Sequence, residues 1–280
     1  MNREKRLLQD GEYENPQWAM AVEEAILKTV AEGTVPDTLR FWRNMAIIIG
    51  RFQCPKNEVN LEHCLRYKVT VVRRFSGGGT VYQDSGNLNF SIYMRTSSGI
   101  ATFSKALNEV GKAVVTSLND LGILAELNDR GVYVRGKKIC GLAGTILREA
   151  ILIHGCLLVD SNVKALYSSL NLKQEGIRRK FTLSRPSEVT TVRNELGKEI
   201  SINEIEKTLT KFFGKTFQCT FILGTITSNE FELAKKLYDQ NYSRLQWHLI
   251  SCKDCPEREK DVPVLKELIF PKRIQVQRGK

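Results

Sequence analysis

The chain has 280 residues, of which 42% are hydrophobic and 26% are charged, a composition that excludes a disordered or fibrous protein and fits one large or two small globular domains. Its 42 Lys and Arg outnumber its 31 Asp and Glu, which gives a formal net charge of +11 and favours an acidic partner. No apolar run is long enough to span a membrane, and no signal-like core follows the first residues, so we expect a soluble, cytoplasmic protein.

The seven cysteines are odd in number and scattered along the chain, which is not the pattern of a disulfide framework. Cys252-x-x-Cys255 has no second pair at zinc-finger spacing, so a structural zinc is not expected unless another chain contributes ligands. The basic residues show no recognition helix and no basic–aromatic repeat. We therefore rank an acidic protein ahead of nucleic acid as the partner, and we expect neither nucleic acid nor a membrane to bind.

In the first half of the chain, Asn15 followed by Pro16 is typical of the start of a helix. Hydrophobic periodicity and β-branched runs predict the elements that follow. These are a helix at 17–30, strands at 39–42 and 46–49 around a turn at Arg43-Asn44, a helix at 57–67, and strands at 69–72 and 87–93.

In the second half, apolar residues recur every three or four positions from 102 to 121, which predicts a long helix that Gly122 ends. The further expected elements are a strand at 123–127, a hairpin turning at Gly136, a strand at 151–160, a helix opened by a capping box at Ser201 and ended by Gly214, a strand at 217–223, a helix from Thr227 to about 241, and a short helix at 264–270. Between them, residues 171–192 form a candidate lid that carries Arg178, Arg179, Lys180 and Arg185.

The segment from Arg73 to Asp84 reads R-R-F-S-G-G-G-T-V-Y-Q-D and lies between two expected strands. Glycines have no Cβ, so their backbone N–H groups can close on phosphate oxygens. Arginine adds paired donors that suit phosphate or carboxylate. The segment therefore predicts an anion site, with a glycine-rich hairpin and solvated arginines as the structural alternative.

A second motif runs from Asn128 to Ala143, where Lys138 opens the second strand of the expected hairpin. Gly141 and Ala143 keep the facing wall small, so that a ligand could lie against the backbone. An exposed hairpin lysine is usually only solvated, and His154 in the next strand, taken alone, is more often a structural histidine.

Together these segments resemble the signatures of the lipoate–protein ligase family, whose catalytic domain is of the biotinyl/lipoyl protein ligase type. The resemblance covers roughly residues 16–247. It is carried by R-R-x-S-G-G-G-x-V-x-H-D from Arg73, N-D…G-x-K-[IV]-x-G-x-A around Lys138, H-G-[TSC]-L-L from His154, I-G-R-x-Q around Arg51, and more loosely by an adenylate-binding loop at 184–190. Gln83 stands where the family often has His, and because an amide does not titrate near neutrality, a proton-carrying role there is in doubt.

The resemblance implies an α+β fold in which helices flank a mixed β-sheet, with a catalytic domain at 1–248 and a short C-terminal tail at 249–280 in place of a larger accessory domain. It implies that lipoate and ATP, with Mg²⁺, give lipoyl-adenylate, and that the lipoyl group then passes to a lysine of an acidic lipoyl domain or a glycine-cleavage H protein. A separate accessory protein, docking on the apolar residues 264–270, is a further implied partner. The alternative is that the tail itself replaces the accessory domain.

The resemblance also implies residue roles, with Lys138 as the catalytic lysine between the two anionic reactants. The implied ATP and adenylate site comprises Arg74, Ser76, Gly77, Gly78, Gly79, Thr80, Val81, Tyr82, Asn128, Asp129 and Lys138. The implied lipoate site comprises Lys138, Gly141, Ala143, His154 and Arg51. Asp129 and Asp84 are candidate carboxylate anchors for Mg²⁺.

Three alternatives compete with a ligase. An octanoyl or lipoyl transferase of the same fold should carry a nucleophilic cysteine just before the Lys138 hairpin, but residues 127–130 contain none. A biotin ligase should show G-R-G-R-x-G-R near the glycines, which is absent here. A basic binding module without enzymatic activity explains the charge but gives neither motif a purpose. The sequence leaves open whether lipoate or octanoate is preferred, which acceptor is used, and the oligomeric state.

Overall fold

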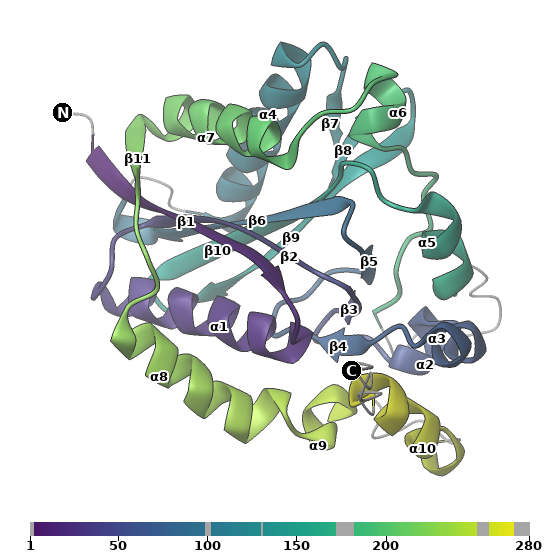
Figure 1. Ribbon diagram of the computed structural model, residues 1–280. Helices are drawn as coiled ribbons and strands as arrows, with labels where there is room; N and C mark the ends of the chain where they lie inside the picture. The colour runs from purple at the N-terminus through teal and green to yellow at the C-terminus, as the bar shows by residue number, and fades with distance from the viewer. Residues whose placement is uncertain (1–2, 99–101, 130, 172–181, 251–257, 272–280) are drawn as a thin grey trace, which may run out of the picture.

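The computed structural model describes residues 3–98, 102–129, 131–171, 182–250 and 258–271. Its main element is an eight-stranded mixed sheet with the strand order β11-β1-β2-β6-β10-β9-β8-β7, and a second sheet has the order β4-β3-β5 (Figure 1). The strands of the large sheet are β1 (Arg3–Tyr13), β2 (Thr38–Asn44), β6 (Asn87–Arg95), β7 (Glu126–Asn128), β8 (Gly131–Val134), β9 (Lys137–Leu147), β10 (Ala150–Leu158) and β11 (Cys219–Leu223). The small sheet contains β3 (Ala46–Ile49), β4 (Val71–Arg73) and β5 (Val81–Gln83).

Helices cover both faces of the large sheet, as expected for an α+β fold. The helices are α1 (Pro16–Glu32), α2 (Pro55–Glu58), α3 (Leu61–Tyr67), α4 (Phe103–Asp120), α5 (Val163–Ser169), α6 (Val192–Leu196), α7 (Ile202–Phe217), α8 (Ser228–Leu237), α9 (Leu245–His248) and α10 (Arg258–Ile269), with a π-helical turn at Tyr238–Tyr242 and a 3₁₀ turn at Thr96–Ser98.

Successive side chains of each strand point to opposite faces of the large sheet, and this alternation produces two separate hydrophobic cores, one on each face. In β2, Phe41 points into the core with α4 and α7, whereas its neighbour Trp42 joins the core with α1 and α8. In β6, Ile92 and Tyr93 divide in the same way. This is the period of two expected for strands that are buried on both faces.

Local capping explains most helix starts. The Asn15 side chain accepts a hydrogen bond from the Trp18 amide, Pro16 occupies the first turn, and Gly33 ends α1 with a φ of +73°. Thr227 and Glu230 form a complete capping box at the start of α8. The sequence predictions of these two helix starts are confirmed.

Three local predictions are wrong. Arg43-Asn44 is not a turn, because β2 continues through Asn44 and the next strand joins the other sheet. The helix predicted at 57–67 is broken between α2 and α3, where Asn60 caps the second helix. Gly214 does not end its helix, because α7 continues to Phe217 and Gln218 takes the left-handed cap position.

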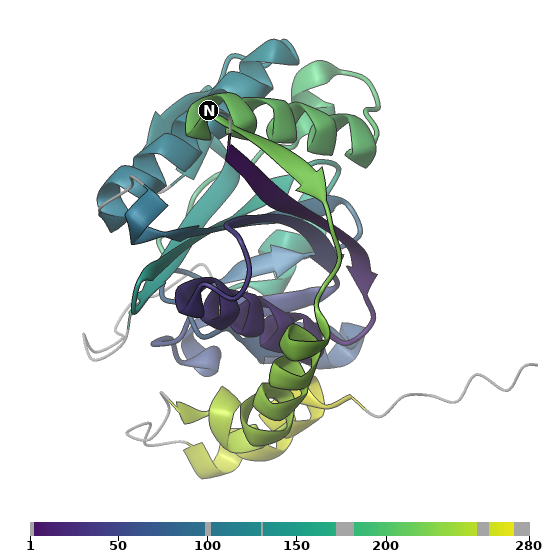
Figure 2. The same cartoon turned by 90° about the vertical axis from the view of Figure 1, so that its left-hand side faces the viewer.

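The C-terminal helix α10 packs on the small sheet and on the residues beside it. Leu268 of α10 lies in the core of the small sheet, and Leu265 and Ile269 pack against Cys54 and Leu249. Figure 2 shows α8, α9 and α10 together on the side of the molecule opposite to α4 and α7. The idea that residues 264–270 offer an apolar surface to another protein is therefore wrong, because the chain itself covers Leu265, Leu268 and Ile269.

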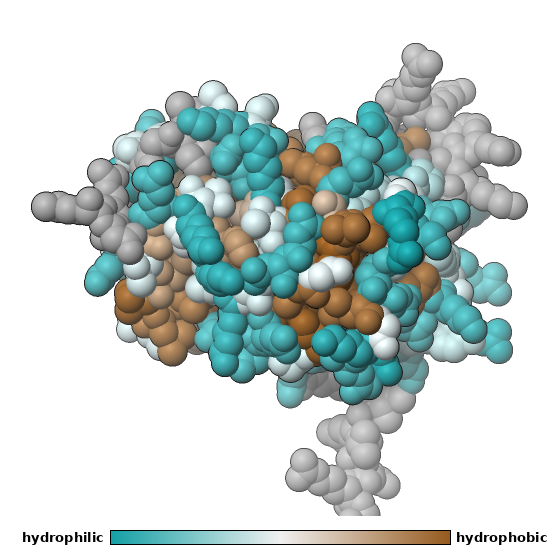
Figure 3. Space-filling model, turned by 90° about the horizontal axis from the view of Figure 1, so that it is seen from above, coloured by the Kyte–Doolittle hydropathy of each residue, from teal (hydrophilic) through white to brown (hydrophobic). Residues whose placement is uncertain are grey.

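Hydrophilic side chains cover most of the surface seen from above, with separate hydrophobic patches between them (Figure 3). Ile222 and Leu223 on the edge strand β11 are among the exposed large hydrophobic residues. Within the described ranges, no helix is both long and apolar enough to cross a membrane.

Candidate functional site

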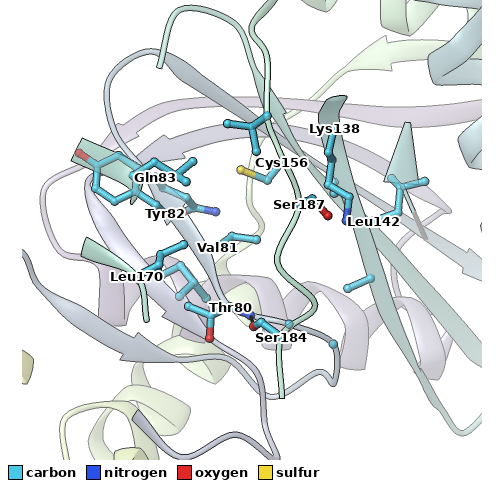
Figure 4. A pocket seen from close by; sticks show the side chains of 18 of the residues that line it. Thr80, Val81, Tyr82, Gln83, Lys138, Leu142, Cys156, Leu170, Ser184 and Ser187 are labelled. Atoms are coloured by element: carbon cyan, nitrogen blue, oxygen red, sulfur yellow. Dashed lines mark hydrogen bonds between the residues drawn. The ribbon is translucent and has the colours of Figure 1, made fainter. Parts of the chain in front are cut away.

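A cavity of about 510 Å³ opens between the glycine-rich loop, strands β9 and β10, helix α1 and the segment 182–189. Figure 4 shows Thr80, Val81, Tyr82 and Gln83 on one side and Lys138 and Leu142 on the other, with the segment that carries Ser184 and Ser187 passing between them. The structure thus brings the two sequence motifs to opposite walls of one cavity.

The glycine-rich loop joins β4 to β5, which lie on either side of β3 and do not pair with each other. The alternative of a glycine-rich hairpin is therefore wrong. At Gly78, φ is +92° and an added Cβ would lie 2.9 Å from the Ala143 Cβ. Because only glycine combines this conformation with such a close approach, Gly78 lets the loop lie directly against β9.

Arg74 holds the loop from beneath. Its Nη2 donates to the carbonyls of Gly77 and Gly79, both at 2.7 Å, its Nη1 donates to the Ile48 carbonyl, and its Nε donates to Ser76 Oγ. Burial lowers the pKa of Arg74 to about 10. The guanidinium also lines the cavity, so it fixes the loop while it adds positive charge to the wall.

The other arginines of the motifs lie differently. The Arg73 guanidinium is buried and donates to backbone carbonyls of Gly50, Gln53 and His248. The Arg51 guanidinium stacks on Trp247, 4.3 Å from the ring centroid. Among the described residues, those that line the cavity do not include Arg51.

Lys138 lies where the hairpin prediction places it. Arg135 and Gly136 both have positive φ, which makes the two-residue turn between β8 and β9. The Lys138 Nζ lies 5.4 Å from the centroid of the Tyr133 ring, and both residues line the cavity. Lys137 is exposed and is not among the described residues of the wall.

His154 belongs to a buried chain of hydrogen bonds. Its Nδ1 lies 3.0 Å from Glu23 Oε1, and its Nε2 lies 3.0 Å from Ser76 Oγ. Because a carboxylate only accepts, Nδ1 carries the proton; Ser76 already accepts from Arg74, so its hydroxyl can donate to Nε2. Burial opposes ionisation of Glu23, but His154, Ser91 and Arg40 outweigh it and lower the pKa of this carboxyl. The sequence motifs do not include Glu23, which lies in the helix expected at 17–30.

The two candidate metal carboxylates differ in their surroundings. Asp84 is buried, and its two oxygens accept from the amides of Gly86 and Asn162. Asp129 is 60% exposed, lines the cavity and pairs with Arg185 at 3.0 Å. No group of three or more His, Cys, Asp or Glu that could hold a metal occurs among the described residues.

The remaining implied residues vary in position. A Cβ built on Gly141 would meet no atom within 4 Å, so the wall is open there to a ligand. Asn128 ends β7 and is exposed, and the described lining does not include it. Of the candidate lid residues, Arg185 stands at the cavity, whereas Arg178, Arg179 and Lys180 lie outside the described residues.

The cysteine thiols near the cavity are buried. Burial raises the pKa of the Cys156 thiol, which lines the cavity, to about 12. Burial also raises the pKa of Cys140, in the hairpin strand, well above its ordinary value. Both thiols are therefore protonated at neutral pH, and the thiolate is the nucleophilic form. Cys252 and Cys255 lie outside the described residues.

Known proteins resemble this chain over most of its length. A profile of the family described as "Lipoyl protein ligase A/B catalytic domain" matches residues 15–214. "Lipoate-protein ligase A subunit 1" of Thermoplasma acidophilum is 35% identical over 249 residues, covering 84% of this chain and 92% of the relative. "Octanoyltransferase LipM" of Brevibacillus brevis is 28% identical over 263 residues, covering 84% and 95%.

Two solved structures are similar over most of the chain. A lipoate-protein ligase A bound with ATP has a TM-score of 0.77 at 32% identity, covering 89% of this chain and 99% of that one. A bi-partite lipoate protein ligase from Thermoplasma acidophilum, described together with its E2 lipoyl domain, has a TM-score of 0.78 at 32% identity, covering 89% and 97%. The expected fold is confirmed.

Proposed function

The chain belongs to the lipoyl protein ligase A/B catalytic-domain family, and we propose that it is an ATP-dependent lipoate–protein ligase. A carboxylate oxygen of lipoate attacks the α-phosphorus of ATP, and the bond to pyrophosphate breaks. The product is lipoyl-adenylate. The amine of an acceptor lysine then attacks the acyl carbon and loses a proton, and AMP leaves.

The observation that carries this proposal is the placement of Lys138 across the cavity from the glycine-rich loop. The first step brings two anions together, so a fixed ammonium between them lowers their repulsion and stabilises the charge of the transition state. The assignment of the adenylate to the residues from Arg74 to Tyr82, with Asp129 at the mouth, follows from the same arrangement. The similar structure with bound ATP supports the use of ATP.

Mg²⁺ would find one suitable protein ligand here. It is usually held by one or two carboxylates together with substrate phosphates, and the exposed carboxylate of Asp129 at the cavity fits that pattern. Asp84 fits less well, because backbone amides occupy both of its oxygens. When bound, the ion would neutralise charge on the phosphate oxygens.

The acyl chain would lie in the part of the cavity with apolar walls, which Met20, Ile48 and Leu142 contribute. Gly141 and Ala143 leave room along β9. Lys138 would hold the carboxylate end, and His154, oriented by Glu23 and Ser76, would present a polar group beside the chain.

The acceptor would be an acidic lipoyl domain or a glycine-cleavage H protein, which the net charge of +11 favours. The bi-partite ligase of Thermoplasma acidophilum makes a second protein subunit a further candidate partner. Such a subunit would have to bind away from the inner face of α10, which this chain covers itself.

An octanoyl or lipoyl transferase remains the second candidate, because octanoyltransferases are among the relatives. Against it stands the burial of Cys140 and Cys156, which keeps both thiols protonated. Mass spectrometry of a lipoyl domain incubated with the protein, lipoate and ATP·Mg²⁺ tests the ligase, and omission of ATP is the control. Modification that requires ATP supports the ligase. Transfer from an octanoylated protein without ATP would replace it with the transferase.

A further inference from the structure

Ser184, in the segment that crosses the cavity, has a fully engaged hydroxyl group. Its Oγ accepts from the Thr80 amide at 2.8 Å and from Gln53 Nε2 at 3.0 Å, and it donates to Glu58 Oε2. A serine hydroxyl offers one donor and two acceptor positions, and all three are used here. Because protein groups fill all three hydrogen-bonding positions, we infer that the segment has a specific binding site here. A loop without such a site would leave some of these positions to water.

Glu58 provides the buried side of this binding site. It ends α2, is only 2% exposed and lines the cavity. Its Oε1 accepts from the Ser184 amide at 3.1 Å and its Oε2 accepts from the Ser184 hydroxyl. If the segment moved away, this carboxylate would lose both contacts, which is costly unless water replaces them.

The glycine-rich loop provides the other side. Gln53 Oε1 accepts from the Gly50 amide at 2.8 Å and from the Thr80 hydroxyl at 2.9 Å, so Gln53 joins the loop to Ser184. A Cβ added to Gly79 would lie 3.1 Å from Ser184 Oγ. The glycine at this position therefore serves the approach of the segment as well as the shape of the loop.

The far end of the same segment is attached to the catalytic hairpin. The Lys138 amide donates to the Glu188 carbonyl at 2.7 Å, and the Thr190 amide donates to the Lys138 carbonyl at 3.0 Å. Between the two ends, Arg185 pairs with Asp129, but both side chains are exposed, and such pairs contribute little. The buried Glu58–Ser184 contact is thus the side-chain anchor of the segment at the end away from Lys138.

We propose that Glu58 is a positioning residue that holds residues 182–190 closed over the acyl-adenylate until the acceptor arrives. This inference rests on the proposed function, because it assumes that the cavity holds an adenylate. An acyl-adenylate hydrolyses readily, so a clasp on the covering segment would favour transfer over loss to water.

The test measures how long the closed state lasts, without any chemical step. A non-reactive sulfamoyl analogue of lipoyl-adenylate is bound, and its dissociation rate is followed for the wild type, Glu58→Gln, Ser184→Ala and the double variant. Each single change should raise the rate about tenfold. The double variant should show much less than the product of the two single effects, because both changes remove the hydrogen bond from Ser184 Oγ to Glu58, and Ser184→Ala also removes the Oγ contacts with Thr80 and Gln53. Glu188→Gln, whose side chain is exposed in the same segment, is the matched control and should leave the rate unchanged.

Two further readouts separate the clasp from a general loss of structure. Amide hydrogen exchange of Ser184 should accelerate in Glu58→Gln, while exchange in β6 and β10 stays as in the wild type. Without acceptor, the variants should release AMP faster for each adenylate formed. Single changes whose effects multiply in the double variant, or rates within twofold of the wild type, would overturn the proposal. If the wild type does not bind the analogue, the proposed function fails, and hydrogen exchange alone then decides whether Glu58 holds the segment.

Discussion

Replacing Lys138 by alanine removes the ammonium group that β9 places at the cavity. Two unit charges 4 Å apart interact by about 4 kcal/mol at the effective dielectric constant of a partly buried site. The loss of that stabilisation from the transition state corresponds to a rate reduction of about a thousandfold. Adenylate formation by Lys138→Ala should fall by about this factor.

The fold should tolerate the same change. The Lys138 ammonium lies 5.4 Å from the Tyr133 ring centroid, and a cation–π contact of this kind contributes about 0.5–1 kcal/mol near a surface. The free energy of unfolding should therefore drop by about 1 kcal/mol at most. Urea titration of the variant checks this.

The assay is pyrophosphate release from ATP in the presence of lipoate, with Lys137→Ala as the matched control. Lys137 carries the same charge one residue earlier but is exposed and faces away from the described cavity wall, so its loss should change the rate less than threefold or so by screened surface charge alone. Equal rates in the two variants would refute the assignment of the catalytic lysine to position 138.

Four other outcomes are expected. Arg74→Lys should lower ATP-dependent pyrophosphate release about tenfold or more, because one ammonium nitrogen cannot replace the three guanidinium nitrogens that hold the Ile48 carbonyl, the Gly77 and Gly79 carbonyls and Ser76 Oγ; unchanged kinetics would remove Arg74 from the site. Transfer to the acceptor should slow with salt while adenylation changes less, because surface charge is screened over about 8 Å at physiological ionic strength; parallel salt curves would contradict this. Hydroxylamine-sensitive acyl groups should be absent from Cys140 and Cys156 by mass spectrometry after turnover, and their presence would favour the transferase. Burial lowers the pKa of His248 to about 4 in the folded protein. As the pH falls from 6.5 to 4, His248 therefore takes up a proton in the unfolded chain but not in the folded one, and the free energy of unfolding should drop by about 3 kcal/mol. An NMR titration of His248 in the folded protein with a midpoint near 6.5 would show this reasoning to be wrong.

Local chemistry made much of the site predictable. The turn at Gly136, the capped helices and the glycine-rich loop are each encoded within a few residues, so the sequence alone places Lys138 at the start of a strand and Gly78 in a loop. The sequence predicts less well which strands pair with one another. The charged residues of Arg3–Tyr13 hide its alternation, so the sequence predicts no strand there; the strand forms as a parallel neighbour of β2 and β11.

The residues that hold the site in shape could not be recognised from the sequence for the same reason. Glu58 meets Ser184 across 126 positions, and Glu23 meets His154 across 131. Neither carboxylate lies in a motif. Their roles depend on burial and on partners that only the folded chain brings close.

Residues Trp247 and His248 show how such long-range contacts reach the glycine-rich loop. The His248 carbonyl accepts from the Arg73 guanidinium, the His248 Nδ1 accepts from the Arg73 amide, and the Trp247 indole donates to the Arg73 carbonyl. Arg73 immediately precedes the arginine that holds the glycine-rich loop, so Trp247 and His248 fix the start of the motif. The helix that follows, α10, then covers the same small sheet with Leu268. A boundary at residue 248 stays a prediction, but residues on its two sides pack on the small sheet, and two strands of that sheet flank the glycine-rich loop. This is a physical reason to expect that the tail contributes to ATP use.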